Sequence, residues 1–228
     1  MTLKNNNYHP IIKERWTNTY FKSRLNNDPK RNLQFELDEK YIKSFVKNGI
    51  ICDIGCSTGE FIRSINWNGN IYGMEINDYA KKEASDIISF EKNIFTEKNF
   101  FDAIIFRGTI QHVDEPFRMI KKSFQSLKSG GYLFFISTPN ANSLLYKLKG
   151  KLGFLDPHLN FYIPGDKELS NALLNNGFEL ESIEYPYLKT PYCSPIIDHI
   201  KFVFNIFTPM FFPHAFWKSM MNMAAKKP

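Results

Sequence analysis

The stretch ICDIGCSTGEF, Ile51 to Phe61, decides the fold class of this chain. It begins with a short apolar run that is rich in β-branched residues, as is typical of a buried strand. The run breaks at Gly55, and small polar residues continue to Gly59. Two glycines let the backbone turn tightly and approach a ligand closely. A strand, a glycine turn and then a helix predict the first unit of an open α/β sheet, with the turn at the edge where such sheets bind ligands.

The pattern of apolar residues along the chain extends this prediction. Short apolar runs alternate with segments of helical spacing, which favours a parallel sheet covered by helices on both faces, a doubly wound α/β fold. Strands are expected at 50–54, 70–76, 87–90, 101–106, 132–138 and 178–185, and helices at 28–49, 60–65, 78–86, 114–131 and 166–177.

Length and composition indicate one domain over 1–228. The chain has 228 residues, of which 43% are hydrophobic and 23% charged, as expected of a globular protein. Three segments lie outside the simple alternation: a helical extension at 1–30 and two long aromatic insertions at 140–165 and 190–218. Long insertions often carry substrate recognition, so we expect the two insertions to form a lid or an acceptor pocket.

The charge and cysteine content limit the partners. The net charge is +6, but the basic residues occur as scattered pairs, so a solvated basic surface is favoured and no nucleic acid partner is expected. The three cysteines have no paired spacing, which predicts no disulfide framework and no metal site, and fits a reducing cytoplasm. No apolar stretch is long enough to span a bilayer. Residues 195–218 contain many aromatic residues flanked by lysines, and peripheral contact with the inner face of a membrane is one interpretation of them.

The glycine turn also narrows the class of ligand. Ser57 stands where a dinucleotide-binding turn has its second glycine, and no Gly-Lys-Ser/Thr follows, so neither NAD nor a P-loop nucleotide is expected. Glu75 ends the next predicted strand, where an acid can accept the hydroxyl groups of a ribose. Asp53 adds negative charge, which suits an ammonium or sulfonium group. A ligand with a ribose, a positive charge and no pyrophosphate has the profile of S-adenosylmethionine.

Four successive stretches resemble the motifs of class I S-adenosylmethionine-dependent methyltransferases. They are ICDIGCSTGEF, IYGMEIN, FDAIIFRGTIQHVDEP and LKSGGYLFFISTPN, and the resemblance covers about Leu33 to Tyr185. It is strongest to a small-molecule branch that includes ubiquinone-type O-methyltransferases and enzymes of bacterial surface-polysaccharide biosynthesis. It implies a Rossmann-like sheet of seven strands, with the terminal MNMAAKK as a last, antiparallel strand.

The resemblance also implies roles for individual residues. Asp53, Gly55, Cys56, Ser57 and Gly59 would hold the methionine part of S-adenosylmethionine, with S-adenosylhomocysteine as the product. Glu75 would bind the ribose and Ile76 would pack on the adenine. Asn93 stands where the family usually has an aspartate on the adenine amine, and Gln111 stands where relatives often have a glutamate.

Three further residues are candidates for the chemistry. His112 follows a buried strand and is a candidate general base, although a structural role at a helix entry is equally favoured. His158, in the first insertion, is a second candidate, although loop packing is favoured for it. Arg107 can bind an anionic group of the cofactor or the acceptor, or form a structural ion pair.

The resemblance makes a methyltransferase the first hypothesis for function. The preferred acceptor is a hydroxyl group of a sugar or nucleotide-sugar in bacterial surface-glycan synthesis. The alternatives are a quinone-type or lipid-type O-methyltransferase, an RNA methyltransferase, and a non-catalytic partner subunit.

Overall fold

The computed structural model describes residues 17–152, 155 and 160–228. The strands are β1 (Ile51–Ile54), β2 (Ile71–Met74), β3 (Phe101–Arg107), β4 (Leu127–Pro139), β5 (Glu179–Glu184) and β6 (Met220–Lys226). The helices are α2 (Asn18–Arg24), α3 (Pro29–Lys43), α4 (Glu60–Ser64), α5 (Asp78–Ala84), α6 (Pro116–Ser126), α7 (Leu144–Lys149), α8 (Asp166–Asn175) and α9 (Pro195–Phe207), with a short 3₁₀ helix η1 (Ile110–His112).

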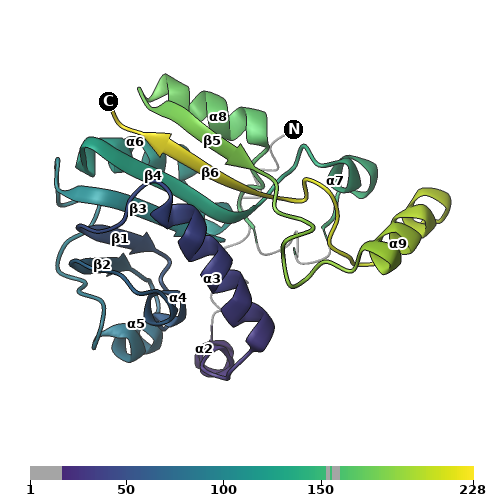
Figure 1. The fold of residues 1–228 in the computed structure, drawn as a ribbon, viewed down its shortest axis with the longest axis horizontal. Coiled ribbons are helices and arrows are strands. Elements are labelled where there is room, and N and C mark those ends of the chain that lie inside the picture. The colour runs from purple at the N-terminus through teal and green to yellow at the C-terminus, as the bar shows by residue number, and fades with distance from the viewer. Residues whose placement is uncertain (1–16, 153–154, 156–159) are drawn as a thin grey trace.

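The strands form one sheet in the order β2-β1-β3-β4-β6-β5 (Figure 1). β2, β1, β3 and β4 are parallel neighbours, whereas β6 runs antiparallel to both β4 and β5. The order reverses at β1, because the chain passes from β1 outward to β2 and then back to β3 on the other side. The predicted Rossmann-like sheet with an antiparallel last strand is therefore confirmed, and its switch point lies at the glycine turn.

The expected count of seven strands is wrong for the described residues, in which the sheet has six. The missing strand is 87–90, which forms a single parallel bridge between Ser89 and Tyr72. The bridge rests on two backbone hydrogen bonds of 3.0 Å, from Gly73 to Ser89 and from Ser89 to Ile71. This segment lies beyond β2 at the edge of the sheet, where a short stretch has a partner on one side only and pairing ends quickly.

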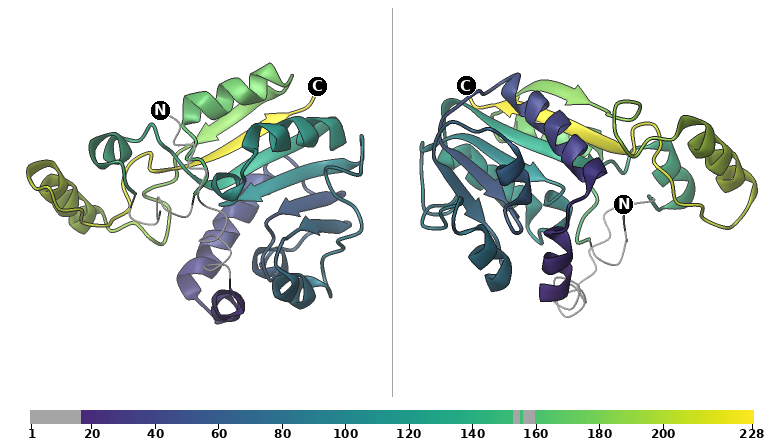
Figure 2. Two further views of the ribbon diagram at one scale, coloured as in Figure 1. Left: turned by 180° about the vertical axis from the view of Figure 1, so that it is seen from behind. Right: turned by 60° about the horizontal axis from the view of Figure 1, so that its bottom comes forward.

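The two faces of the sheet bury separate clusters. Successive side chains of a strand point to opposite faces, and so Ile51 and Ile105 pack with α3, α4 and α5, whereas Cys52 and Ile104 pack with α6 and α8. Figures 1 and 2 show α3 crossing one face and α6 and α8 covering the other. Burial on both faces explains why the central strands are apolar throughout instead of alternating.

Helix α9 lies apart from the sheet, next to α7 (Figure 1). Its exposed phenylalanines contrast with the fully buried Phe101, Phe106, Phe134 and Phe135 of the sheet. The many phenylalanines of the chain are thus found both in the buried core and on the exposed surface. None of the helices in the described ranges combines the length and apolar character needed to cross a bilayer.

Candidate functional site

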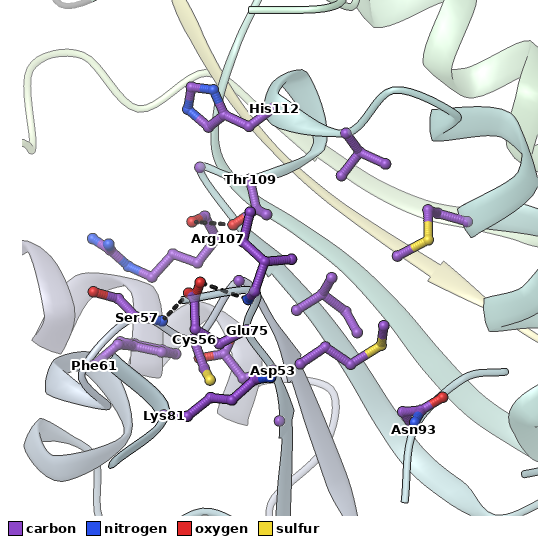
Figure 3. Close-up of a pocket in the computed structure, with 18 of the residues that line it drawn as sticks. Asp53, Cys56, Ser57, Phe61, Glu75, Lys81, Asn93, Arg107, Thr109 and His112 are labelled. Carbon is purple, nitrogen blue, oxygen red and sulfur yellow. Dashed lines mark hydrogen bonds between the residues drawn. The ribbon is translucent and has the colours of Figure 1, made fainter. Parts of the chain in front are cut away.

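A cavity of about 1030 Å³ opens at the carboxyl ends of β1, β2 and β3. Figure 3 shows Asp53, Ser57, Glu75 and Arg107 around one space, with His112 at its upper side. A cavity of this size holds a ligand as large as a nucleoside together with a small second molecule. The position is the one that the open α/β topology predicts for a ligand.

The glycine turn forms the floor of the cavity with a left-handed backbone. The φ angles are +74° at Gly55, +54° at Ser57 and +78° at Gly59, in the region where glycine is favoured. A Cβ atom on Gly55 would overlap the side chain of Thr109. Glycine at this position therefore allows β1 to turn directly beneath the cavity, with Thr109 against the backbone.

Asp53, near the end of β1, is a buried acid beneath the cavity. Its side chain lines the cavity, the residue is 3% exposed, and Oδ1 has no hydrogen-bond partner in the described part of the chain. Burial raises the pKa of Asp53 to about 7, Arg107 lowers it and Glu75 raises it further. A buried carboxylate that lacks a partner is costly, and a cationic ligand group at this point would compensate for that cost.

Glu75 joins the two turns that border the cavity. Its Oε2 accepts the backbone N–H of Ser57 at 3.0 Å, and its Oε1 accepts those of Ile76 at 2.7 Å and Asn77 at 3.0 Å. A carboxylate offers about four lone-pair positions, and three accept these N–H groups, so about one remains. Glu75 is thus fixed in place and can still accept a hydroxyl group of a ligand.

Arg107 forms a structural ion pair, one of the two alternatives expected from the sequence, with Asp38, a partner that the sequence did not indicate. Its Nε donates to Asp38 Oδ2 at 2.8 Å, and its guanidinium lies 4.3 Å from the ring centre of Phe35 and 5.3 Å from that of Phe61. The Asp38 side chain is fully buried and also accepts from Gln34 at 2.8 Å. Arg107 nevertheless lines the cavity. It is therefore both a structural ion-pair partner and a positioned cation that an anion in the cavity can reach.

His112 lies on η1 at the cavity wall. The Gln111 amide nitrogen donates to Gly108 O at 2.8 Å and lies 3.3 Å from His112 Nε2. A neutral imidazole carries a proton on one ring nitrogen and a lone pair on the other, and the tautomer decides whether the Gln111 amide is a hydrogen-bond donor to Nε2. A neutral imidazole beside a ligand cavity can serve as a base.

The remaining predicted residues have different environments. Ile76 is 82% exposed at the cavity wall, and Asn93 lies to one side of the other residues (Figure 3). The side-chain oxygen of Asn93 accepts the backbone N–H of Phe95 at 2.9 Å. Burial and nearby carboxylates raise the pKa of the Cys56 thiol, so it stays protonated and is no nucleophile. The candidate His158 lies outside the described residues.

Helix α2 covers part of the cavity opening. Tyr20, Phe21 and Arg24 line the cavity, and Arg24 pairs with Glu60 of α4 at 3.0 Å. Glu60 also accepts the hydroxyl of Thr58 at 3.0 Å. The Arg24–Glu60 contact was not predicted, because the local sequence around either residue does not indicate which distant residue it contacts.

The model of a methyltransferase domain matches residues 21–183. This chain belongs to that methyltransferase-domain family. The resemblance drawn from the sequence is therefore confirmed at the level of the family.

In the described residues there is no group of three or more His, Cys, Asp or Glu side chains that could hold a metal ion.

Two curated relatives share the name ubiquinone biosynthesis O-methyltransferase. The protein of Hydrogenovibrio crunogenus is 28% identical over 124 residues, which are 48% of this chain and 51% of that protein. The protein of Nitrosomonas europaea is 29% identical over 115 residues, which are 44% of this chain and 48% of that protein. This chain thus spans about half the length of the curated relatives that it matches.

A solved structure extends the likeness in fold to nearly the whole chain. It is described as a methyltransferase dependent on S-adenosylmethionine, possibly a histamine N-methyltransferase, from Thermotoga maritima. The TM-score is 0.60 at 20% identity, and the match covers 96% of this chain and 99% of that one. At this identity the likeness concerns the fold, and fold alone does not decide the acceptor.

Proposed function

We propose that this chain transfers a methyl group from S-adenosylmethionine to a hydroxyl oxygen of a small acceptor. The single observation that carries the proposal is the buried acid Asp53 beneath the cavity, whose Oδ1 has no hydrogen-bond partner among the described residues. A cationic ligand with a ribose fits this donor set, because Asp53 offers negative charge and Glu75 offers an acceptor for a hydroxyl group. Family membership supports the same reaction.

The residues that would hold the cofactor follow from their positions. Asp53 balances the positive charge, and the turn of Gly55, Cys56, Ser57 and Gly59 receives the methionine part along its backbone. Glu75 accepts a ribose hydroxyl, Ile76 offers an exposed apolar surface to the adenine, and Asn93 offers an amide to the adenine amine. When bound, S-adenosylmethionine supplies an electrophilic methyl group on a sulfonium leaving group.

The acceptor we favour is a hydroxyl group on an aromatic, quinone-type ring. Both curated relatives carry a name from ubiquinone biosynthesis, and aromatic side chains such as Phe35, Phe61 and Phe161 line the cavity. Aromatic walls suit a flat apolar ring better than a sugar with many hydroxyl groups. The sugar or nucleotide-sugar acceptor has no corresponding support.

The chain's own groups then have three tasks. His112 takes the proton of the acceptor hydroxyl as the oxygen attacks, since histidine is the side chain that most often serves as a general base. Arg107, oriented by Asp38, holds an anionic group of the cofactor or acceptor. His158 remains a second candidate base. The enclosing side chains of α2 exclude water and align the reactants.

The first insertion supplies part of the cavity wall. Phe161, from the 140–165 segment, lines the cavity, and its backbone N–H donates to Gln111 O at 2.9 Å. This position suits a role of the first insertion in acceptor recognition. The second insertion, 190–218, contributes none of the residues that line the cavity in the described part of the chain.

The test offers methyl-labelled S-adenosylmethionine with either a dihydroxylated aromatic acid or a nucleotide-sugar. We expect label in the aromatic hydroxyl, and a loss of about 10²–10⁴-fold in turnover for His112→Gln. S-Adenosylhomocysteine binding by His112→Gln should be unchanged, as should turnover by the control His199→Gln. Label in the nucleotide-sugar would replace the proposed acceptor, and label in added RNA would favour an RNA enzyme. A folded chain that does not bind S-adenosylhomocysteine would be a non-catalytic subunit.

A further inference from the structure

Helix α9 presents its apolar residues to solvent and its polar residues to the protein. Asp198 is 4% exposed and Asn205 is fully buried, whereas Ile196 and Phe207 are about four-fifths exposed. At 100° per residue, Asp198 and Asn205 lie on one side of the helix and the apolar residues on the other. This is the reverse of the arrangement in a helix that packs on a core.

Specific contacts hold α9 in this orientation. The Asn205 side chain donates to Phe212 O at 3.0 Å and accepts the Phe212 N–H at 3.0 Å. Asp198 accepts the Tyr187 hydroxyl at 3.0 Å and the Ser194 N–H at 2.8 Å. These buried polar groups are satisfied only while the apolar side of the helix faces outward. The exposure is therefore built into the local structure.

The outward side forms a continuous apolar face. Its members are about half exposed or more, and they follow the i, i+3, i+4 spacing of one helical stripe. We define the α9 face as Ile196, Ile197, Ile200, Val203, Phe204, Ile206 and Phe207. Met210 and Trp217, at 63% and 55% exposed, follow it in sequence. An exposed apolar patch of this extent on a described surface marks a contact with another phase or molecule.

The described chain segments that flank α9 in sequence or contact it through α7 carry exposed charge of one sign. In the described segments 141–152 and 186–218 the basic residues are Lys147, Lys149, Lys151, Lys189, Lys201 and Lys218, and the acidic residue is Asp198. Asp198 is buried and bonded as described above, so these two segments present lysines and no exposed carboxylate. Lys149 donates to Thr208 O at the end of α9, which ties α7 to the same face.

We propose that the α9 face docks on an anionic lipid surface. An amphipathic helix lying at the interface buries its apolar side among the acyl chains, while flanking lysines meet anionic headgroups. A second copy of this chain fits the face less well, because a twofold contact would place the same lysines of both copies together. The proposal concerns membrane attachment and does not depend on the methyl-transfer reaction.

The experiment is flotation of the full chain with lipid vesicles. One set is phosphatidylcholine alone, and the other contains phosphatidylglycerol as well. We expect the native chain to float with the mixed vesicles, and raised salt to weaken that binding. The triple variant Ile200→Ser, Phe204→Ser, Phe207→Ser should bind at least tenfold less. The matched control is Leu174→Ser, because Leu174 is 53% exposed on α8 and lies outside the α9 face.

A second variant tests the contribution of the lysines, and a second readout tests whether the apolar face enters the lipid. Lys147→Gln with Lys151→Gln should reduce binding to the mixed vesicles while leaving the apolar face intact. The fluorescence of Trp217 should shift to the blue on adding mixed vesicles, with Trp217→Phe identifying its share of the signal. Thermal melting checks that each variant is folded, and exposed positions are expected to tolerate serine.

Three outcomes would overturn the proposal. The first is a native chain that stays with the soluble fraction. The second is a folded triple variant that floats as well as the native chain. The third is self-association of the native chain that the triple variant abolishes, with no vesicle binding, since the occupant would then be a second copy. Methyl transfer is measured separately, so vesicle binding without transfer would reject only the reaction.

Discussion

The cavity and helix α9 are opposite exceptions to the rule that charged groups are exposed and apolar side chains are buried. At the cavity the chain buries a carboxylate, Asp53, that has no hydrogen-bond partner for Oδ1 in the described part of the chain. At α9 it exposes a stripe of isoleucine, valine and phenylalanine while satisfying its polar groups inside. Buried polar and exposed apolar groups both cost free energy in the isolated chain. Under the two proposals above, a cationic ligand would compensate for the buried carboxylate and a lipid surface would cover the exposed apolar stripe.

Asp38 can be compared directly with Asp53, because it is also a buried carboxylate but accepts hydrogen bonds on both of its oxygens. It pairs with Arg107, and the Gln34 amide donates to its other oxygen. Asp38 and Asp53 are thus buried to a similar extent, but they differ in their hydrogen-bond partners. Removing the Asp38 carboxylate should destabilise the folded state, whereas removing the Asp53 charge should stabilise it.

The largest effect is expected from Asp38→Ala. The variant leaves Arg107 partly buried without its carboxylate, which should lower the free energy of unfolding by about 3–5 kcal/mol. Urea denaturation measures this change. The control is Asp78→Ala, which removes an exposed carboxylate 3.7 Å from Lys81 and should leave stability nearly unchanged. An equally small loss for Asp38→Ala would mean that the buried pair does not stabilise the fold.

The next effect has the opposite sign. The pKa of Asp53 is raised from its usual value of 3.8 to about 7 in the folded chain. Between these two pH values the folded state therefore binds more protons than the unfolded state. The stability contribution of Asp53 is therefore present at acidic pH and is lost as pH rises through about 7. Asp53→Asn should raise the free energy of unfolding by about 2–4 kcal/mol near pH 8 and by almost nothing near pH 4.

Urea denaturation of both chains across that pH range measures the difference. The same variant should bind S-adenosylhomocysteine more weakly, because the site then loses its negative charge. A variant that is less stable than the native chain near pH 8 would show that Asp53 already has a partner, and the first half of the comparison would fail.

Glu75→Ala should show the next largest effect, on binding. We expect S-adenosylhomocysteine to bind the native chain with micromolar affinity, about −8 kcal/mol. Loss of the ribose acceptor should weaken this by about 1.5–3 kcal/mol, the range for a hydrogen bond to a charged group. Calorimetric titration measures both values, with the exposed acid variant Glu179→Ala as control. Equal affinities of Glu75→Ala and the native chain would remove Glu75 from the ribose site.

Much of the fold was predictable because its signals are local. The apolar runs, the glycine turn and the acid at the end of β2 each lie within a few residues, and helix boundaries follow from caps such as Asp28 before Pro29. The edge segment 87–90 was harder, since its short apolar pattern does not reveal how many hydrogen bonds an edge position allows. Here the sheet provides one bridge at Ser89.

The partners in the ion pairs and the orientation of α9 could not be predicted from the sequence. Asp38 and Arg107 are far apart in the chain, and only the packing of α3 across the sheet brings them together. A helix with one apolar stripe has the same periodicity whether that stripe faces a core or solvent. The orientation is decided by Asn205 and its partner Phe212, which lie in adjoining segments and are ordinary residues in sequence.

The smallest effect we predict concerns that orientation. Asn205→Ala removes both hydrogen bonds to Phe212 and should destabilise the attachment of α9 by about 1–2 kcal/mol. Because α9 lies outside the main core, the loss should be local, with faster amide hydrogen exchange in α9 and unchanged exchange in β1. The control Ile206→Ala alters an adjacent, exposed position and should leave exchange in α9 nearly as in the native chain. If exchange in α9 is unaffected by Asn205→Ala, the outward apolar face is not held by this contact, and its exposure needs another cause.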